Sequence, residues 1–153
     1  MEIRDILSPE AVICGLKAAN KKQALQEMSR QAAAVTALNE KRIFETLLER
    51  ERLGTTGVGN GIAIPHGKLP KLNKLFGLFA RLERPVEFEA LDGQPVDLVF
   101  LLLAPEAAGA DHLKALARVA RLLRDADVAR KLRDSRDAEA LYAVLAMPSA
   151  SAA

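Results

Sequence analysis

The sequence predicts a single α/β domain in which a central mixed β-sheet is flanked by helices on both faces. The chain has 153 residues, which is the size of one domain with one hydrophobic core. Two apolar runs, 75–82 and 98–103, are hydrophobic on both of their faces, as expected of central strands covered by helices. Stretches with apolar residues at helical spacing precede and follow these runs. Helices are therefore available for both sides of a sheet, and this is the simplest architecture for the pattern.

Two amphipathic helices are expected before the first of these strands. Asn20 can cap the first helix, with Gln23 placed three residues on as in a capping box. Its apolar face would consist of Ala24, Leu25, Met28, Ala32 and Val35. Asn39 can start the second helix, which ends at Gly54 directly before a glycine-rich loop. Its apolar face would consist of Ile43, Phe44, Leu47 and Leu48.

The remaining elements follow from the same signals. Strands are expected over three segments: 61–65, 75–82 and 98–103. Asp111 is expected to cap a further helix, and residues 137–145 are expected to form a closing helix. The domain is expected to span residues 1–146 and to be followed by a flexible C-terminal tail at 147–153.

Composition and charge argue against several classes of protein. The net charge is +2, from 22 basic and 20 acidic residues that are interleaved along the chain, which disfavours a nucleic-acid surface. The longest apolar run, 98–104, is too short to span a bilayer, so no membrane insertion is expected. Cys14 is the only cysteine, so no internal disulfide can form, and the N-terminus lacks the apolar core of a signal peptide. A cytoplasmic location is therefore expected.

The most informative segment is the loop 51–68, which contains five of the nine glycines and one of the two histidines. Glycine lets backbone N–H groups turn inward and approach an anion closely, so we interpret the loop as a phosphate site. The residues expected to bind phosphate are Thr56, Gly57, Gly59, Asn60, Gly61, Gly67 and Lys68. The loop lacks the glycine and lysine offsets of the nucleotide-binding fingerprints, and no cofactor is expected.

Two histidines and one arginine are the candidate catalytic residues. His66 follows Pro65 at the end of the glycine loop, and an imidazole that is largely neutral near pH 7 is a nucleophile suited to accept a phosphoryl group. His112 lies in the first turn of an expected helix, where a neutral ring can donate a hydrogen bond to a phosphoryl oxygen. Arg50 and Arg52 precede the first glycine of the loop, and a guanidinium can bind phosphoryl oxygens bidentately. Each has a plainer alternative: an exposed turn for His66, capping and packing for His112, and a solvated charge for Arg50.

A metal-dependent hydrolase that uses His66, His112 and Asp111 is a further alternative. A metal site needs at least three ligands, and the spacing of these residues matches no recognised pattern, so no metal is expected. Thr55 and Thr56 are available as nucleophiles of a hydrolytic triad, but the chain contains no Gly-x-Ser-x-Gly elbow. The hydrolase therefore ranks below phosphoryl transfer to a histidine.

The segment 53–68 resembles the EIIA proteins of the bacterial phosphotransferase system, within the fructose and mannitol class and most of all its nitrogen-regulatory branch. The resemblance runs from about residue 3 to residue 145, with family-like stretches at 91–103 and 112–117. It implies that His66 accepts a phosphoryl group from a histidine of a small HPr-like carrier, which is charged from phosphoenolpyruvate through an enzyme I. It also implies that His112 is the second active-site histidine and that Arg50 is the active-site arginine.

The resemblance leaves two outputs open. Sugar-specific members pass the phosphoryl group to an EIIB cysteine and are often fused to that domain and to a membrane EIIC. Cys14 lies in an apolar segment without such a signature, so it is not expected to replace the EIIB cysteine. Similar proteins of the nitrogen-regulatory branch act instead on partners such as sensor kinases and potassium-transport components. The regulatory output is the expected one, and the sugar-specific output is the alternative.

Overall fold

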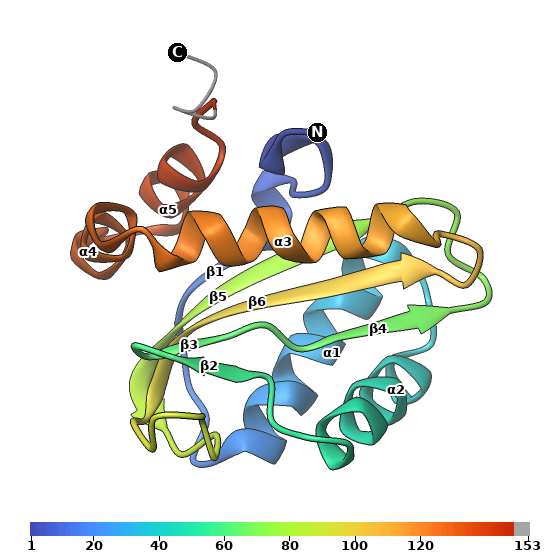
Figure 1. Cartoon of the computed structure of the whole chain (residues 1–153), viewed down its shortest axis with the longest axis horizontal. Coiled ribbons are helices and arrows are strands. Elements are labelled where there is room, and N and C mark those ends of the chain that lie inside the picture. Colours follow the sequence, from blue (N-terminus) through green and yellow to red (C-terminus); the bar gives the residue numbers. More distant parts are fainter. Residues whose placement is uncertain (149–153) are drawn as a thin grey trace.

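The computed structural model describes residues 1–148. Within these residues, five α-helices flank a six-stranded mixed β-sheet, so the predicted fold class is confirmed (Figure 1). The strands are β1 (Val12–Leu16), β2 (Gly57–Gly59), β3 (Ile62–Ala63), β4 (His66–Leu69), β5 (Phe76–Val86) and β6 (Val96–Pro105). The helices are α1 (Lys21–Thr36), α2 (Glu40–Arg52), α3 (Ala110–Arg124), α4 (Ala126–Asp134) and α5 (Ala138–Leu145), and two short 3-10 helices, Ile3–Asp5 and Pro9–Ala11, precede β1.

The long strands β5 and β6 form the centre of the sheet. They pair antiparallel, with Phe79 opposite Phe100. β1 pairs parallel with β5, and β3 and β4 pair parallel with β6, while β2 pairs antiparallel with β3. The strand order is β1-β5-β6-β3-β2, with β4 beside β6. The sheet is therefore mixed, as the sequence predicts.

β3 and β4 follow one another along the same edge of β6. Pro65 separates them, because proline has no backbone N–H to donate to the ladder. Its carbonyl still accepts a hydrogen bond from the Leu102 amide at 2.9 Å. The strand expected to end at Pro65 is thus shorter than predicted, and a separate strand, β4, begins with His66 opposite Leu102.

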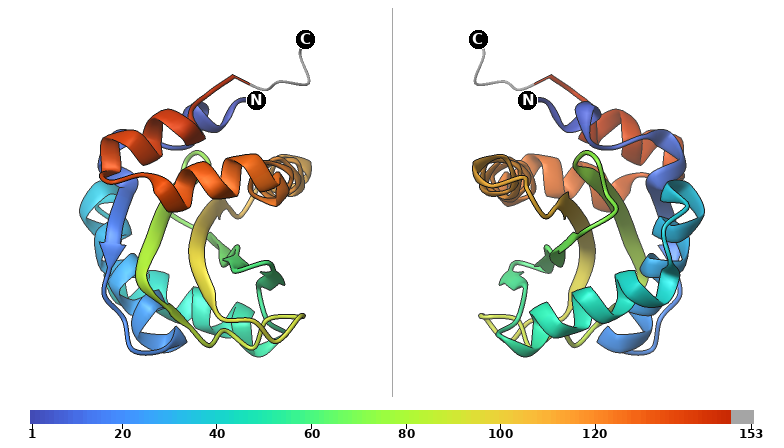
Figure 2. Two further views of the ribbon diagram at one scale, coloured as in Figure 1. Left: turned by 90° about the vertical axis from the view of Figure 1, so that its left-hand side faces the viewer. Right: turned by 90° about the vertical axis from the view of Figure 1, so that its right-hand side faces the viewer.

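Helices cover both faces of the sheet. In Figure 1, α3, α4 and α5 lie on one side of the sheet, and α1 and α2 lie on the other; Figure 2 shows the same layers from the two ends. β6 is consequently enclosed on both faces, and its residues 98–104 have 0% exposed surface. This burial explains why that segment is apolar at every position rather than at alternate ones.

Three predicted helix starts are confirmed. Asn20, Asn39 and Asp137 each accept a hydrogen bond from the backbone N–H three residues on, at 2.8, 2.9 and 2.8 Å respectively. Such caps satisfy amide groups that have no partner within the helix. The Gln23 side chain accepts from the Ala19 amide at 2.6 Å, one residue before the cap, so the predicted capping box is shifted by one position.

The predicted cap of α3 is wrong. The helix begins at Ala110, and Gly109 occupies the cap position with φ 55°. Glycine adopts this left-handed conformation without steric cost, so the chain can turn into the helix before Asp111 is reached. Asp111 lies instead in the first turn of α3, where a negative charge interacts favourably with the helix dipole.

Several elements are absent from the sequence prediction. β2 and β4 are short strands that contain glycine, a residue typical of loops, and β1 shows no alternation of buried and exposed positions. α4 buries only Ala129 and Leu132, too few positions to reveal a helical period. β5 also continues to Val86, beyond the predicted end at residue 82.

Two further expectations concern the membrane and the C-terminal tail. Among residues 1–148, no helix is both long and apolar enough to cross a lipid bilayer. The tail was expected at residues 147–153, and residues 149–153 of it lie outside the described part of the chain. Met147, which is described, is 56% exposed just after the end of α5.

The two central strands give a stability prediction. Phe100 is fully buried, packs against Phe79 with ring centroids 6.4 Å apart, and lies where a Cβ on Gly77 would approach its ring to 2.8 Å. Phe100→Ala should lower the free energy of unfolding by about 3–5 kcal/mol, because the site cannot collapse around the lost ring. Leu91→Ala, at a position 80% exposed, is the control and should change it by less than about 0.5 kcal/mol. Urea denaturation measures both, and equal effects would contradict the assigned core.

Candidate active site

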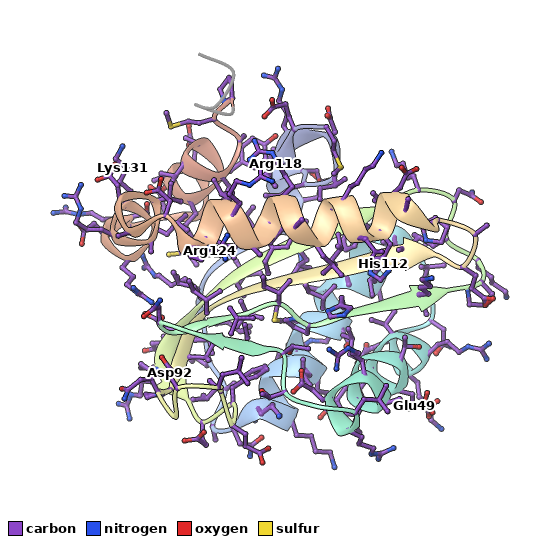
Figure 3. All side chains as sticks on the ribbon, in the orientation of Figure 1. Glu49, Asp92, His112, Arg118, Arg124 and Lys131 are labelled. Atoms are coloured by element: carbon purple, nitrogen blue, oxygen red, sulfur yellow. The ribbon has the colours of Figure 1, made fainter. Side chains whose placement is uncertain are left out.

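An open cavity of about 650 Å³ lies where three elements meet at one end of the sheet. The elements are the C-terminal half of α2, strand β4 and the first turn of α3. In Figure 1, β4 lies between α3 above it and α2 below it. The residues that line the cavity are Thr46, Glu49, Arg50, Arg52, Leu53, His66, Gly67, Lys68 and His112. In Figure 3, His112 extends from α3 towards α2, which carries Glu49. The fold thus brings together both histidines and the arginine that the sequence predicts.

The hydrogen bonds of His66 assign its tautomer. Its Nδ1 lies 2.8 Å from the carbonyl oxygen of Ile64, which can only accept, so Nδ1 carries the ring proton. Its Nε2 lies 3.2 Å from Nε of Arg50, and a guanidinium can only donate. Nε2 is therefore unprotonated, and its lone pair lies beside the positive charge of Arg50, which lines the cavity together with His66.

Both histidines are neutral at neutral pH. Burial lowers the pKa of His66, and the charge of Arg50 lowers it further, while the Ile64 carbonyl and Glu51 act in the opposite direction. Burial is also the main cause of the lowered pKa of His112, followed by His66 and Lys68. A neutral imidazole keeps a lone pair on one nitrogen and can act as a nucleophile or hydrogen-bond acceptor. Acidification would protonate that nitrogen and remove this ability.

His112 contains an unsatisfied polar atom. The residue is only 7% exposed, and its ring meets that of His66 edge-on, with centroids 5.6 Å apart and an angle of 65° between the planes. Within residues 1–148, its Nε2 is buried and has no hydrogen-bond partner. Buried polar atoms in proteins nearly always have a partner, so this atom indicates a place for a group that is not part of the chain. The plainer capping role does not account for it, because Gly109 occupies the cap position.

Arg50 is held in place from two sides. Its Nη1 donates to the carbonyl of Gly54 at 3.0 Å, while its Nε faces His66. Arg52 and Lys68 are exposed residues that line the same cavity. The positive charges outnumber the single carboxylate of Glu49, so the cavity favours a negatively charged group.

Gly67 allows strand β4 to approach helix α2. A Cβ at this position would lie 2.6 Å from Cγ2 of Thr46, closer than side-chain atoms can pack. The absence of a side chain therefore lets His66 and Lys68, on either side of Gly67, lie beside α2.

Five residues expected to bind phosphate do not line this cavity: Thr56, Gly57, Gly59, Asn60 and Gly61. The Thr56 amide donates to the Glu51 carboxylate at 3.1 Å, and the Gly57 amide donates to Oγ1 of Thr55 at 3.0 Å. The Asn60 amide donates to Asp92 at 2.9 Å. These three amides already have partners inside the protein, and none of the five residues lines the cavity, so we do not retain an anion-binding role for them.

The glycines of the loop serve a β-hairpin instead. Gly59, Asn60 and Gly61 have φ values of 106°, 56° and 78°. Gly59 is the last residue of β2, and Asn60 and Gly61 form the turn that leads into β3. Asp92, whose carboxylate accepts from the Asn60 amide, lies at the lower left of Figure 3, away from His112. A tight hairpin and an anion-binding loop both require positive φ, which is why the composition alone does not distinguish them.

Three residues of the cavity were missed by the sequence prediction: Thr46, Glu49 and Leu53. All three lie on or just after α2, one helical turn or less from Arg50. Residues three or four positions apart share a helix face, so the spacing from Arg50 is the signal that could have identified Thr46 and Leu53. Glu49 is adjacent to Arg50, and this spacing gives no signal for it. Leu53 is 85% exposed and places an apolar surface at the cavity rim.

The arrangement offers no support for a metal centre. Within residues 1–148, no group of three His, Cys, Asp or Glu side chains is placed to hold a metal ion. Asp111, the third ligand of the hydrolase alternative, is exposed in the first turn of α3 and does not line the cavity.

The fold and the paired histidines beside an arginine define an EIIA-type domain. A family model described as phosphoenolpyruvate-dependent sugar phosphotransferase system, EIIA 2, matches residues 5–147, and the chain therefore belongs to this family. The resemblance to its nitrogen-regulatory branch is confirmed by relatives. The chain is 69% identical to a nitrogen regulatory protein of Bradyrhizobium diazoefficiens over 153 residues, which is the full length of both. It is 40% identical to the nitrogen regulatory protein of Escherichia coli over 146 residues, covering 95% of this chain and 90% of that one.

A solved structure supports the same assignment. The crystal structure of the nitrogen regulatory protein IIA-Ntr from Neisseria meningitidis matches with a TM-score of 0.88 and 35% sequence identity. The match covers 94% of this chain and 98% of the other. The fold seen here is therefore shared with an EIIA protein of the nitrogen-regulatory branch.

The lowered pKa values of the two histidines predict loss of stability on acidification. The unfolded chain binds protons at these residues at about pH 6.5, whereas the folded chain resists protonation until a lower pH. The free energy of unfolding should therefore fall between pH 7.5 and pH 5.5, and fall less in a His66→Gln/His112→Gln variant. Asp92 and Asp127 also have lowered pKa values, but they titrate below this range. Urea denaturation at both pH values tests this, and an equal fall in both proteins would contradict it.

Proposed function

We propose that this protein is a phosphohistidine carrier of the nitrogen-regulatory phosphotransferase system. His66 accepts a phosphoryl group from an HPr-like phosphocarrier protein, and the phosphorylation state then regulates partner proteins in the cytoplasm. One observation carries the proposal: Nε2 of His66 is unprotonated at the cavity, between the guanidinium of Arg50 and the ring of His112. Neutral imidazole in this tautomer is a nucleophile that needs no base to remove a proton.

The proposed transfer is an in-line displacement at phosphorus. The Nε2 lone pair of His66 forms a new N–P bond while the N–P bond of the donor phosphohistidine breaks, and the electron pair of that bond stays with the donor ring. The hydrogen bond from Arg50 to Nε2 must be released first, which leaves Nε of the guanidinium to donate to the phosphoryl oxygens. The proton on Nδ1 stays in place, where the Ile64 carbonyl stabilises the positive charge that develops on the ring.

The surrounding residues stabilise the charge of the transferred group. In the tautomer with a proton on Nε2, His112 donates to a phosphoryl oxygen and gains the partner that this atom lacks. Lys68 and Arg52 add positive charge at the rim of the cavity. No cofactor is needed for this step, because the donor supplies a phosphoryl group that is already activated.

A second output is supported by the family description, which refers to sugar phosphotransferase systems. In that case His66 would pass its phosphoryl group to an EIIB partner. The relatives described above are named nitrogen regulatory proteins, and this favours regulatory partners such as sensor kinases or potassium-transport components.

The phosphoryl-acceptor proposal predicts a mass change. Incubation with phosphoenolpyruvate, enzyme I and an HPr-like protein should add one phosphoryl group to the wild type and none to His66→Ala. His112→Ala should still be labelled, but about a hundredfold more slowly, because one preorganised hydrogen-bond donor is lost. Intact mass spectrometry over time measures all three proteins.

The controls distinguish a loss of phosphoryl transfer from a loss of folding, and a regulatory output from sugar transport. Circular dichroism should show that both variants are folded, since neither ring belongs to the apolar core. Full labelling of folded His66→Ala would remove the acceptor assignment, and wild-type kinetics for His112→Ala would remove its role. Sugar-dependent loss of label on addition of an EIIB protein would favour the transport output.

The regulatory proposal predicts that partner affinity depends on phosphorylation. A phosphoryl group adds negative charge to a cavity lined by Arg50, Arg52 and Lys68, so an acidic partner surface loses favourable contacts there. Its affinity should fall by about 5- to 150-fold, which corresponds to a coupling of about 1–3 kcal/mol. Isothermal titration calorimetry of a candidate sensor kinase with both states of the wild type tests this, with His66→Ala as the unphosphorylated control. Equal affinities for the two states would leave a carrier without this regulation.

A further inference from the structure

We propose that Glu51 is a positioning residue for His66, acting through Thr56 and Ile64 to hold the imidazole in the tautomer that accepts the phosphoryl group. The proposal rests on the function assigned to His66 above. Glu51 itself does not line the cavity. Its effect on the nucleophile is carried by a chain of hydrogen bonds through the protein interior.

The first link is a buried carboxylate with several partners. The Glu51 side chain is 3% exposed, and its Oε2 lies 2.9 Å from the ammonium group of Lys21. Its two oxygens also accept from the backbone amide of Thr56, at 3.1 and 3.2 Å, and Oε1 accepts from the Thr56 hydroxyl. Burying a carboxylate is costly, so this arrangement needs its partners to remain in place. Thr56 is thereby fixed relative to the end of α2.

The next links connect Thr56 to the imidazole. The carbonyl of Thr56 accepts from the amide of Ile64 at 3.0 Å. The carbonyl of Ile64 accepts from Nδ1 of His66 at 2.8 Å. Ile64 precedes Pro65, which restricts its backbone to extended conformations and limits the directions in which its carbonyl can point. The position of the acceptor for Nδ1–H thus depends on the anchoring of Thr56 by Glu51.

The same turn of α2 therefore controls both nitrogens of His66. Arg50 contacts Nε2 directly, while its neighbour Glu51 acts on Nδ1 through the chain described above. The negative charge of Glu51 also favours positive charge on the imidazole, which develops as the N–P bond forms. Partners that orient a histidine in this way typically affect its function by about ten- to a hundredfold in metal sites, where the effect has been measured most often.

The test uses an isosteric substitution and a matched control. Glu51→Gln keeps the shape of the side chain but removes its charge and weakens it as an acceptor. Lys21→Met/Glu51→Gln additionally removes the ammonium group that would lose its buried carboxylate partner and keep only Glu89 and the Phe88 carbonyl, so a folded protein is available if the single variant unfolds. Glu45→Gln removes a carboxylate from the exposed side of the same helix and is the control.

Two readouts are needed. The first is the ¹⁵N chemical shifts of the His66 ring as a function of pH, which report the tautomer and the pKa and require no phosphoryl donor. In either Glu51 variant, part of the population should move to the tautomer protonated on Nε2, and the pKa of His66 should fall. The second is the kinetics of phosphoryl acceptance: kcat should fall by about ten- to a hundredfold while KM for the HPr-like donor is unchanged. Glu45→Gln should match the wild type in both.

The outcomes separate this inference from the proposed function. A folded Glu51 variant with wild-type ring shifts and wild-type kcat would overturn the inference, even if its thermal stability were reduced, because Glu51 would then be structural only. Failure of the wild type to accept a phosphoryl group would overturn the proposed function instead. In that event the ring shifts alone would still decide whether Glu51 sets the tautomer of His66.

Discussion

The close approach of strand β4 to helix α2 is the constraint on which the geometry of the site depends. Gly67 faces Thr46 at a distance that leaves no room for a side chain, and this close approach accompanies the contact between Arg50 and the first residue of β4. The opposite edge of β4 is hydrogen-bonded to the central strand β6, which is buried on both faces. His66 therefore belongs to the rigid part of the sheet rather than to a mobile loop. Its neighbours on α2 can act on it because the strand and helix share one packed interface.

Burial and charge have different roles at this interface. Burial keeps both imidazole rings neutral, while basic side chains at the rim make the cavity suited to an anion. The charged groups beneath the site are paired: Glu51 bonds to Lys21, which also contacts Glu89 at 3.3 Å and lies 5.2 Å from the centre of the Phe88 ring. Among residues 1–148, the one buried side-chain polar atom without a partner is Nε2 of His112. This atom thus belongs to a residue that lines the cavity where a ligand is expected.

The sequence predicted those elements whose signals come from residues close together in the chain. Asn20, Asn39 and Asp137 bond to amides three residues away, so the starts of their helices could be recognised without the fold. The continuous apolar run of β6 likewise identified a central strand. β4 was missed because its pairing depends on a neighbour that is distant in sequence, and Gly67 gives no strand signal by itself. Local composition therefore identified the capped helices and the central strands, and it did not identify the short strands at the edge of the sheet.

The site was predicted in its residue types but not in its geometry. His66, His112 and Arg50 were found from their context and from the family resemblance, whereas the tautomer of His66 depends on a backbone carbonyl that no pattern specifies. The cavity in which they meet is open, with Leu53 and Lys68 exposed at its rim. Such a site admits a protein surface, and it also admits water. A phosphorylated His66 would therefore carry a signal of limited lifetime, because hydrolysis of its N–P bond would return the protein to its starting state without the help of a phosphatase.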